Sequence, residues 1–372
     1  MHRIRFHYTL GPDSGPALVR NPLLDLLQAV AAHGSITAAA RELRLSYRHV
    51  WGELKRWEEA LGSRLIVWEK GQAARLTEFA SKLLWAERQA QARLLPQIEA
   101  LRADLERAFA VAFDDSAHVL TFYASHDEAL AGLREQALAE APRLHLDVRF
   151  TGSVDAIRAL NEGRCTLAGF HTLHEPAMGT LAQRTYKPLL RPGRHKLIGF
   201  AQRTQGLIVA PGNPLGLRSL HDLARSGARY ANRTLGSGTR VVFDELLAQA
   251  RLAAAGIAGY ARTEPSHAAV AQAVAAGEVD AGLGLEATAR ARGLDFIPLV
   301  HERYHLACLK ATLAQPATLA LLKVLRSPGW QARLAAIPGY AATQSGEVLS
   351  MRRVLPWWHY RSARHREAEG GT

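Results

Sequence analysis

The segment Asn232–Arg240 holds residue types that could do chemistry, because two glycines flank a serine just before a predicted helix. Glycine lets successive backbone N–H groups turn inward, and a helix N-terminus adds unpaired donors and a positive dipole end. Ser237 and Thr239 add hydroxyls, and Arg240 adds a planar cation. The pattern is typical of a site for a small anion or for the anionic group of a larger ligand. It would equally suit a capped helix start with a glycine-rich turn.

The elements around this segment alternate between strands and helices. Buried strands are expected at 119–124, 144–150, 167–170, 207–210 and 281–285. Helices are expected at 127–140, 153–161, 219–224, 239–250 and 267–276. This alternation predicts parallel sheets with helices on both faces, and ligands of such sheets bind beyond the carboxyl ends of the strands.

Polar clusters follow four of these strands, at Ser125–Asp127, Thr151–Ser153, His171 and Gly236–Arg240. Each cluster alone is explained by a helix N-cap, which is the better explanation for Asp127 and Ser153. Four clusters at equivalent positions favour one binding cleft. The histidines at 171 and 267 are equally compatible with a structural role. The expected ligand-binding residues are Ser125, His126, Ser153, His171, Thr204, Gly236, Ser237, Gly238, Thr239, Arg240 and His267.

The first part of the chain has a different periodicity. The expected order is helix 22–33, helix 36–43, helix 47–60, a strand at 64–68 and a return strand from 75. Ser35 and Ser46 are expected N-caps of the second and third helices. Three helices followed by a two-stranded wing predict a winged helix-turn-helix.

A long helix at 77–110 follows the wing. One stripe of this helix is apolar, comprising Leu83, Leu84, Ala90, Leu94, Ile98, Leu101 and Leu105. The stripe could dock on its own domain, but a partner helix from a second subunit is favoured, because a two-fold operator needs a two-fold protein.

The composition limits the classes of protein and of site. The chain has 372 residues, 48% of them hydrophobic, and a net charge of +12 that is spread along its length. A basic balance favours anionic partners, including nucleic acid. Cys165 and Cys308 lack CxxC spacing and are expected to be reduced core residues, so no metal site is expected. Neither a signal peptide nor a run of ~18 apolar residues occurs, so a cytoplasmic protein without a membrane span is expected.

Two resemblances to known families agree with these patterns. Gly34–Leu43 followed by Ser46–Trp51 resembles the DNA-binding domain of the molybdate-responsive ModE-type regulators and, more distantly, that of the LysR type. This resemblance covers about Pro22 to Phe109 and implies a recognition helix that enters the major groove.

The second resemblance is to the periplasmic-binding-protein-like domain related to molybdate- and tungstate-binding proteins, and it covers about Ala117 to Tyr340. It implies two lobes that close over a ligand, with the chain crossing near Arg203–Val209 and returning near Phe296–Tyr304. The matching segments are Thr204–Pro214, Asn232–Arg233, Gly236–Arg240, Gly259–Tyr260, Ser266–Ala271, Asp280–Gly284 and Gly293–Phe296.

Within the first domain, Arg48 is expected to read guanine, and Tyr47, Lys55 and Arg56 to hold phosphates. The acidic residues nearby would also allow a merely solvated helix face. The expected DNA-binding residues are Ser35, Thr37, Ser46, Tyr47, Arg48, His49, Lys55, Arg56, Lys70 and Arg75.

The expected fold is multidomain, with an α-rich winged helix-turn-helix and an α/β two-lobed periplasmic-binding-protein-like domain of type II. The expected divisions are a lead-in (1–20), the winged helix-turn-helix (21–76), a linker or dimerisation helix (77–114), the ligand-sensing domain (115–345) and a basic tail (346–372).

The expected function is a ligand-responsive transcriptional regulator that binds double-stranded DNA as a homodimer or homotetramer. The expected ligand is a small oxyanion such as molybdate or tungstate, and molybdenum cofactor or a small carboxylate such as formate remain alternatives. An enzyme is the competing class, but no catalytic residues are expected, because GxSxG, HExxH and Walker-type sequences do not occur. An architectural DNA-binding protein is a third possibility.

Overall fold

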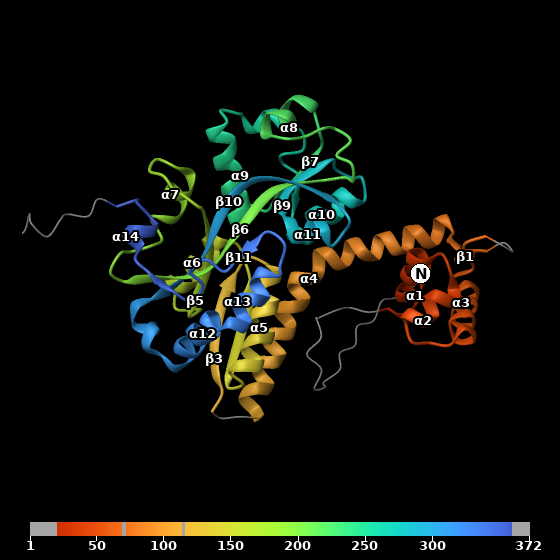
Figure 1. Cartoon of the computed structure of the whole chain (residues 1–372), viewed down its shortest axis with the longest axis horizontal. Helices are drawn as coiled ribbons and strands as arrows, with labels where there is room; N and C mark the ends of the chain where they lie inside the picture. The colour runs from red at the N-terminus through yellow and green to blue at the C-terminus, as the bar shows by residue number, and fades with distance from the viewer. Residues whose placement is uncertain (1–20, 69–71, 114–115, 359–372) are drawn as a thin grey trace, which may run out of the picture. The chain divides into compact units, whose positions relative to one another are not determined.

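The computed structural model describes residues 21–68, 72–113 and 116–358 (Figure 1). It divides into two compact units, residues 1–98 (unit 1) and 99–372 (unit 2). The expected lead-in and the wing residue Lys70 lie outside the described residues.

Unit 1 is built on three short helices, α1 (Pro22–His33), α2 (Ile36–Glu42) and α3 (Tyr47–Leu61). Each begins after a capping residue whose side-chain oxygen accepts a backbone N–H of the first turn. The capping residues are Asn21, Ser35 and Ser46 respectively. Their apolar faces form one core, which includes Leu27, Val30, Ala39, Val50 and Leu54. The expected helix-turn-helix is therefore present.

The wing consists of β1 (Ile66–Val67) and β2 (Arg75–Leu76), paired antiparallel. Glu58 on α3 anchors its start, because its Oε1 accepts the backbone N–H of Leu65 at 2.8 Å. After the wing, α4 (Glu78–Phe113) runs three residues past the expected end at 110 and contains Pro96.

No single helix of the described residues is long and apolar enough to cross a membrane. Helices α1 and α2 pass such a test only as a pair bent by 120°, and their apolar residues belong to the core of unit 1.

Unit 2 contains a sheet of ten strands among the described residues, and eight of them follow the order β4-β3-β5-β10-β6-β9-β7-β8. These eight are β3 (His118–Ala124), β4 (Leu144–Phe150), β5 (Leu167–Leu173), β6 (His195–Val209), β7 (Tyr230–Arg233), β8 (Thr263–Glu264), β9 (Ala281–Leu285) and β10 (Asp295–Leu309). The two short strands β11 (Tyr340–Ala341) and β12 (Val348–Leu349) pair with β6.

The helices of unit 2 cover this sheet. They are α5 (Glu128–Glu140), α6 (Ser153–Asn161), α7 (Leu181–Tyr186), α8 (Leu220–Ser226), α9 (Gly238–Gln249), α10 (His267–Ala275), α11 (Glu286–Arg290), α12 (Pro316–Arg326), α13 (Pro328–Ala335) and α14 (Met351–Val354). Two short 3₁₀ helices lie at Ala254–Gly256 and Lys310–Ala314.

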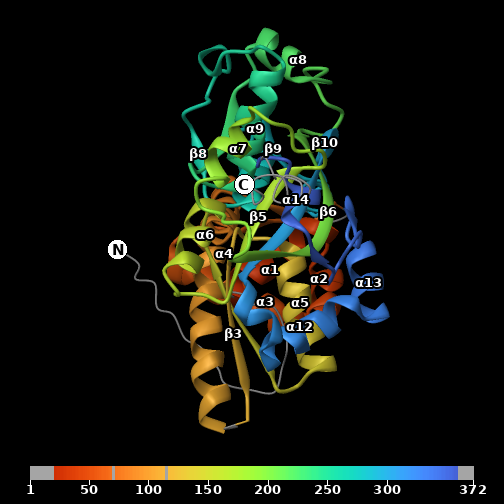
Figure 2. The same cartoon turned by 90° about the vertical axis from the view of Figure 1, so that its left-hand side faces the viewer.

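Two lobes share the long strands β6 and β10, which run through both (Figures 1 and 2). One end of this pair joins β5 in the first lobe, and the other end joins β9 in the second lobe. Both β5 and β9 are antiparallel to their long neighbours, whereas β3 with β4 and β7 with β9 are parallel. The expected parallel sheets are therefore only partly correct, and the sheet is mixed. The crossing strands lie where the resemblance implied them, but β6 begins at His195, well before the expected strand at 207.

Residues 346–358, which begin the expected basic tail, pack on the first lobe. Strand β12 pairs with β6, and the fully buried Trp357 lies 6.4 Å from the ring of Tyr186. The expected domain end at 345 therefore falls inside a packed region, because the tryptophans at 357 and 358 bury apolar surface there.

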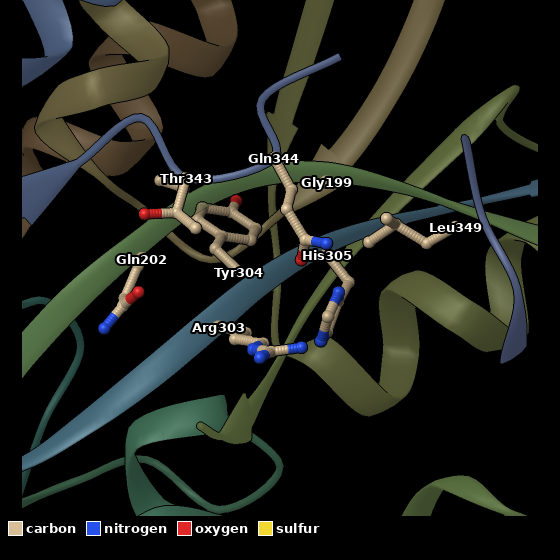
Figure 3. Close-up of a pocket in the computed structure, with 9 residues that line it drawn as sticks. Gly199, Gln202, Arg303, Tyr304, His305, Thr343, Gln344 and Leu349 are labelled. Atoms are coloured by element: carbon tan, nitrogen blue, oxygen red, sulfur yellow. The ribbon is translucent and has the colours of Figure 1, made fainter. Parts of the chain in front are cut away.

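The close approach of this C-terminal segment to β6 leaves only a small cavity beside Gly199, Tyr304, Gln344 and Leu349 (Figure 3). A Cβ at Gly199 would meet the carbonyl group of Gln344. The cavity measures about 10 Å³, which is room for about one water molecule. It is too small for an effector.

Gly206 lies on β6 beside the register shift between Pro298 and Val300 of β10. A Cβ at residue 206 would run into the carbonyl oxygen of Ile297, a backbone atom. We expect Gly206→Ala to lower the free energy of unfolding of unit 2 by about 1–3 kcal/mol, as overpacking does. Urea denaturation measures the change.

The control is Gly256→Ala, because a Cβ at residue 256 would have nothing within 4 Å. Its free energy of unfolding should stay within about 0.5 kcal/mol of wild type. Equal destabilisation by the two substitutions would contradict the close approach of β6 and β10.

Candidate anion-binding site

Arg203 lies at the point where β6 crosses between the lobes, and its side chain is fully buried. Its guanidinium group pairs with two carboxylates, those of Asp127 at the start of α5 and Glu302 on β10. Tyr340 donates to Asp127 Oδ2 at 2.9 Å, and Gln205 donates to Glu302 Oε2 at 2.7 Å. Burial alone would lower the pKa of Arg203, but the two carboxylates raise it above its ordinary value. The side chain of Arg203 is therefore a satisfied buried cation.

Arg233, the last residue of β7, is a second buried cation with the opposite surroundings. Its Nη2 donates to the carbonyl oxygen of Pro265 at 3.0 Å. Its Nε and Nη1 have no hydrogen-bond partner, and no carboxylate pairs with it, among the described residues. Burial, and then the positive charge of Arg203, lower the pKa of Arg233 to about 10. A buried charge without a partner is costly, and an anion placed against it would remove that cost.

Three buried histidines lie within electrostatic reach of Arg233, and all are neutral near pH 7. Burial lowers the pKa of His126 to about 4; Asp127 opposes this shift and Arg233 adds to it. Burial and the charges of Arg203 and Arg233 hold the pKa of His171 and of His267 well below the ordinary value. A neutral imidazole offers one donor and one acceptor, so these rings can bind an anion through N–H groups.

The two lobes touch beside these side chains. A Cβ at Gly152, before α6, would lie 2.7 Å from the carbonyl oxygen of Gly236, before α9. A Cβ at Gly238 would lie 2.9 Å from Ser153 Oγ and still closer to the ring of His171. The N-termini of α6 and α9 therefore approach one another across the crossing, and both positions require glycine.

Several hydroxyl groups belong to the same candidate site. Ser125 Oγ is buried without a partner among the described residues, and so is Ser153 Oγ, although the Tyr186 hydroxyl lies beside it. Thr239 Oγ1 accepts from Gln205 at 3.3 Å and lies 3.4 Å from His267 Nε2. Ser237 Oγ accepts the backbone N–H of Arg240, as an N-cap does. The residues that come together from the expected set are Ser125, His126, Ser153, His171, Gly236, Ser237, Gly238, Thr239 and His267.

Two expected ligand residues already have other side-chain partners. Arg240 is already neutralised, because its Nε donates to Asp244 Oδ2 at 3.0 Å and its guanidinium carbon lies 4.2 Å from the centre of the Tyr260 ring. Thr204 contacts His301 Nδ1 at 3.0 Å. Since successive side chains of a strand point to opposite faces, Thr204 lies opposite to Arg203 and Gln205.

His171 belongs to the region but not to a strand-to-helix junction. It lies inside β5, which continues to Leu173 and is buried along its whole length. Arg233 is absent from the ligand residues expected from the sequence. A cation two residues after the Tyr230–Ala231 pair was the available signal, because that pattern places it at a strand end.

A larger hollow of about 390 Å³ lies at the amino ends of β3 and β4, lined by residues that include His118, Arg143, Leu144 and Lys323. Ligands of α/β sheets bind at the carboxyl ends of strands instead, where Ser125 and Arg233 lie. Within the described ranges, no group of three or more His, Cys, Asp or Glu side chains is arranged to hold a metal ion.

In unit 1, the amino-terminal turn of α3 presents exposed side chains. Tyr47, Arg48 and His49 are exposed, and the Tyr47 ring is stacked parallel to Trp51 at 6.4 Å. Arg48 has no ion-pair partner among the described residues. Ser46 caps the helix through its oxygen, as Ser35 does for α2.

The other residues expected to contact DNA differ in whether they already form an ion pair. Lys55 pairs with Glu58 at 2.8 Å, and Arg56 pairs with Glu53 at 2.5 Å. Thr37 on α2 and Arg75 in the wing are exposed.

Comparison with known families agrees with both units. The model of the PBP superfamily domain matches residues 135–326, over half of the chain. The model described as "Bacterial regulatory helix-turn-helix protein, lysR family" matches residues 22–81.

Two curated relatives are themselves uncharacterised. Protein YvgK of Bacillus subtilis (strain 168) is 31% identical over 215 residues, which are 58% of this chain and 68% of that protein. A protein from the 5′ region of the ferredoxin 2Fe-2S gene of Clostridium pasteurianum is 34% identical over 95 residues, which are 25% of this chain and 84% of that protein.

Among solved structures, the LysR family transcriptional regulator CbnR is 17% identical, with a TM-score of 0.41, and the match covers 82% of this chain and 99% of CbnR. The chain belongs to the PBP superfamily and carries a lysR-type helix-turn-helix, so it combines the ligand-binding and DNA-binding domains of a LysR-type transcriptional regulator.

Proposed function

We propose that this regulator senses a small anion bound between the lobes of unit 2 against Arg233. The observation that carries the proposal is the buried guanidinium group of Arg233, which has two nitrogens without partners and forms no ion pair with a carboxylate among the described residues. Arg203 sits in the same region, yet two carboxylates neutralise it. The anion would neutralise the charge of Arg233, as Asp127 and Glu302 neutralise the charge of Arg203.

The contact between the lobes limits the size of the ligand. Gly152 and Gly238 already approach the opposite lobe so closely that neither tolerates a Cβ without movement. This geometry favours a small anion over a pterin phosphate such as molybdenum cofactor, which would require the lobes to open further.

The chemistry of the surroundings supports an oxyanion or a small carboxylate. A guanidinium group matches the oxygens of both, and the hydroxyls of Ser125 and Ser153 with the neutral His267 add donors without adding charge. Molybdate and tungstate therefore stay the first ligands to test, with formate as the alternative.

On the DNA side, we propose that α3 enters the major groove through Tyr47, Arg48 and His49, and that the protein is a homodimer or homotetramer. Leu94 and Leu101 of α4 are 44% and 62% exposed, as residues that pack against a partner helix would be in a single chain.

The first test concerns the anion. Molybdate, tungstate, sulfate, phosphate, formate and molybdenum cofactor are screened by thermal shift, where a ligand at 100 times its Kd adds about 2.7 kcal/mol of stability. Arg233→Gln should weaken the binding of the responding anion by about 2–5 kcal/mol, because the buried anion loses its cation. The ligand-free variant should be no less stable than wild type, since an unpaired buried charge has been removed.

Arg229→Gln is the matched control, because Arg229 lies in the same lobe, carries the same charge and is paired with Asp280 on the surface. It should keep the thermal shift of wild type. An unchanged Kd in Arg233→Gln would sink the proposed site.

The second test concerns DNA. With an operator selected in vitro from random sequence, Arg48→Ala should weaken specific binding by about 1–3 kcal/mol if Arg48 reads a base. Lys55→Ala should weaken binding to all sequences and reduce the salt slope by about one. Gel shift or anisotropy at several salt concentrations measures both.

Arg225→Ala removes the same charge from the surface of unit 2, where Arg225 pairs with Asp222, and should leave operator affinity unchanged. If Arg48→Ala and Lys55→Ala also bind like wild type, α3 is not the recognition helix.

A further inference from the structure

The C-terminal segment 346–358 packs against α7 and against α6, whose first turn belongs to the candidate anion site. Strand β12 of this segment pairs with β6, and α14 shares one apolar core with residues of α6 and α7 (Figure 1). The model of the PBP superfamily domain matches residues 135–326. The family match therefore gives no role to the C-terminal segment.

Trp357 of this segment holds the side chain of Tyr186, the last residue of α7. The two rings are stacked, with their centres 6.4 Å apart and an angle of 21° between their planes. The ring of Phe170 on β5 meets the Tyr186 ring edge-on at 5.3 Å. Gln183, also on α7, donates through Nε2 to the carbonyl oxygen of Trp357 at 3.2 Å. Because Tyr186 and Trp357 are fully buried, these contacts fix the direction of the Tyr186 hydroxyl.

The Tyr186 hydroxyl lies beside the hydroxyl of Ser153, the first residue of α6. Ser153 is fully buried at the contact between the lobes, where the next residue, Val154, donates its backbone N–H to the carbonyl oxygen of Gly236 at 3.4 Å. Neither hydroxyl has a further hydrogen-bond partner among the described residues. Burial raises the pKa of Tyr186 above its ordinary value, so its hydroxyl keeps its proton near pH 7.

Two neighbouring hydroxyls carry two protons, and only one of these protons can be used between them. When Tyr186 donates to Ser153 Oγ, the proton of Ser153 has no acceptor among the described residues. A buried donor without an acceptor is costly, and an anion that accepts from it removes that cost. The direction from Tyr186 to Ser153 follows from the packing, because ring contacts fix the phenol whereas Ser153 lies where the lobes meet.

We propose that the C-terminal segment completes the anion site through Trp357 and Tyr186. Trp357 fixes the Tyr186 ring, the Tyr186 hydroxyl donates a hydrogen bond to Ser153 Oγ, and Ser153 donates a hydrogen bond to the bound anion. Trp357 and Tyr186 are positioning residues, and Ser153 is the residue that touches the ligand. The inference rests on the proposed function, to which it adds a chain of donors and a role for residues 346–358.

A double-mutant cycle tests this chain of donors. Calorimetry with molybdate, sulfate and formate identifies the anion that wild type binds. Ser153→Ala should weaken its binding by about tenfold or more, because a hydrogen bond to a charged group is lost. Tyr186→Phe should weaken it by about fivefold, since Ser153 loses the donor that directs its proton. In the Ser153→Ala background, Tyr186→Phe should have no further effect.

Ser125→Ala is the matched background, because Ser125 is also a buried serine whose hydroxyl has no partner among the described residues. In that background Tyr186→Phe should keep its full effect. Equal effects of Tyr186→Phe in the two backgrounds would mean that Tyr186 acts through packing alone, which would overturn the inference and leave the proposed function intact. If none of the three anions binds wild type, the proposed anion site is wrong and the inference fails with it.

The same arrangement predicts a stability that is measured without any anion. In Tyr186→Phe, the Ser153 hydroxyl has no hydrogen-bonding neighbour among the described residues, so its removal should cost nothing. The midpoint of urea unfolding should therefore be no lower for Tyr186→Phe combined with Ser153→Ala than for Tyr186→Phe alone. A lower midpoint in the double variant would mean that Ser153 has a structural partner, and would contradict the chain of donors.

Trp357→Leu tests the C-terminal segment itself. It should weaken anion binding by about fivefold, and this loss should also vanish in the Ser153→Ala background. Trp358→Leu is the matched control and should bind the anion like wild type, because the Trp358 ring lies 6.0 Å from Trp357 and makes no ring contact with Tyr186 among the described residues. A loss in Trp357→Leu that persists in the Ser153→Ala background would rule out action through Tyr186. If Trp357→Leu does not fold, the cycle with Tyr186→Phe decides the inference by itself.

Discussion

The pairing of Arg203 with Asp127 and Glu302 is the interaction around which unit 2 is arranged. It joins the loop before α5, strand β6 and strand β10 at the point where the chain passes between lobes. A buried guanidinium requires such partners, because an uncompensated charge in this setting costs several kcal/mol. Because Arg203 pairs with both carboxylates, neither remains to neutralise Arg233, and the proposed anion site rests on that difference.

The two arginines show how one residue type serves opposite purposes. Arg203 holds strands together and also lies 3.1 Å from His171 Nδ1, which helps to keep that ring in place. Among the described residues, the guanidinium group of Arg233 donates to the carbonyl oxygen of Pro265 and has no carboxylate partner. A ligand shifts an equilibrium only through its differential affinity for two states, and in the proposed function the unpaired guanidinium group of Arg233 would supply it.

The helix termini in both units show the same division. Ser35, Ser46 and Ser237 each accept a backbone N–H with their hydroxyl oxygen, so they define where helices begin. Ser125 and Ser153 make no such bond among the described residues, and both belong to the proposed ligand site. The difference between a cap and a candidate ligand group is thus decided by whether a backbone donor lies within reach.

The amino-acid sequence by itself determined the local structure of this protein. The three helices of unit 1, the second and third with serine caps, the short wing and most strands and helices of unit 2 follow from periodicity and from Gly and Ser placement. The pairing of Arg240 with Asp244 was also within reach of the sequence, since residues four apart meet on one helix face.

Only the tertiary structure decided which arginine is free, because the partners of Arg203 lie 76 and 99 residues away along the chain. The sequence also did not reveal the length of β6. Polar residues such as Arg203 and Gln205 are unusual in a buried strand, and only in the folded chain do Asp127, Glu302 and Thr239 form hydrogen bonds with them. Local sequence reports backbone preference, whereas the charge balance of a buried site depends on groups that only folding brings together.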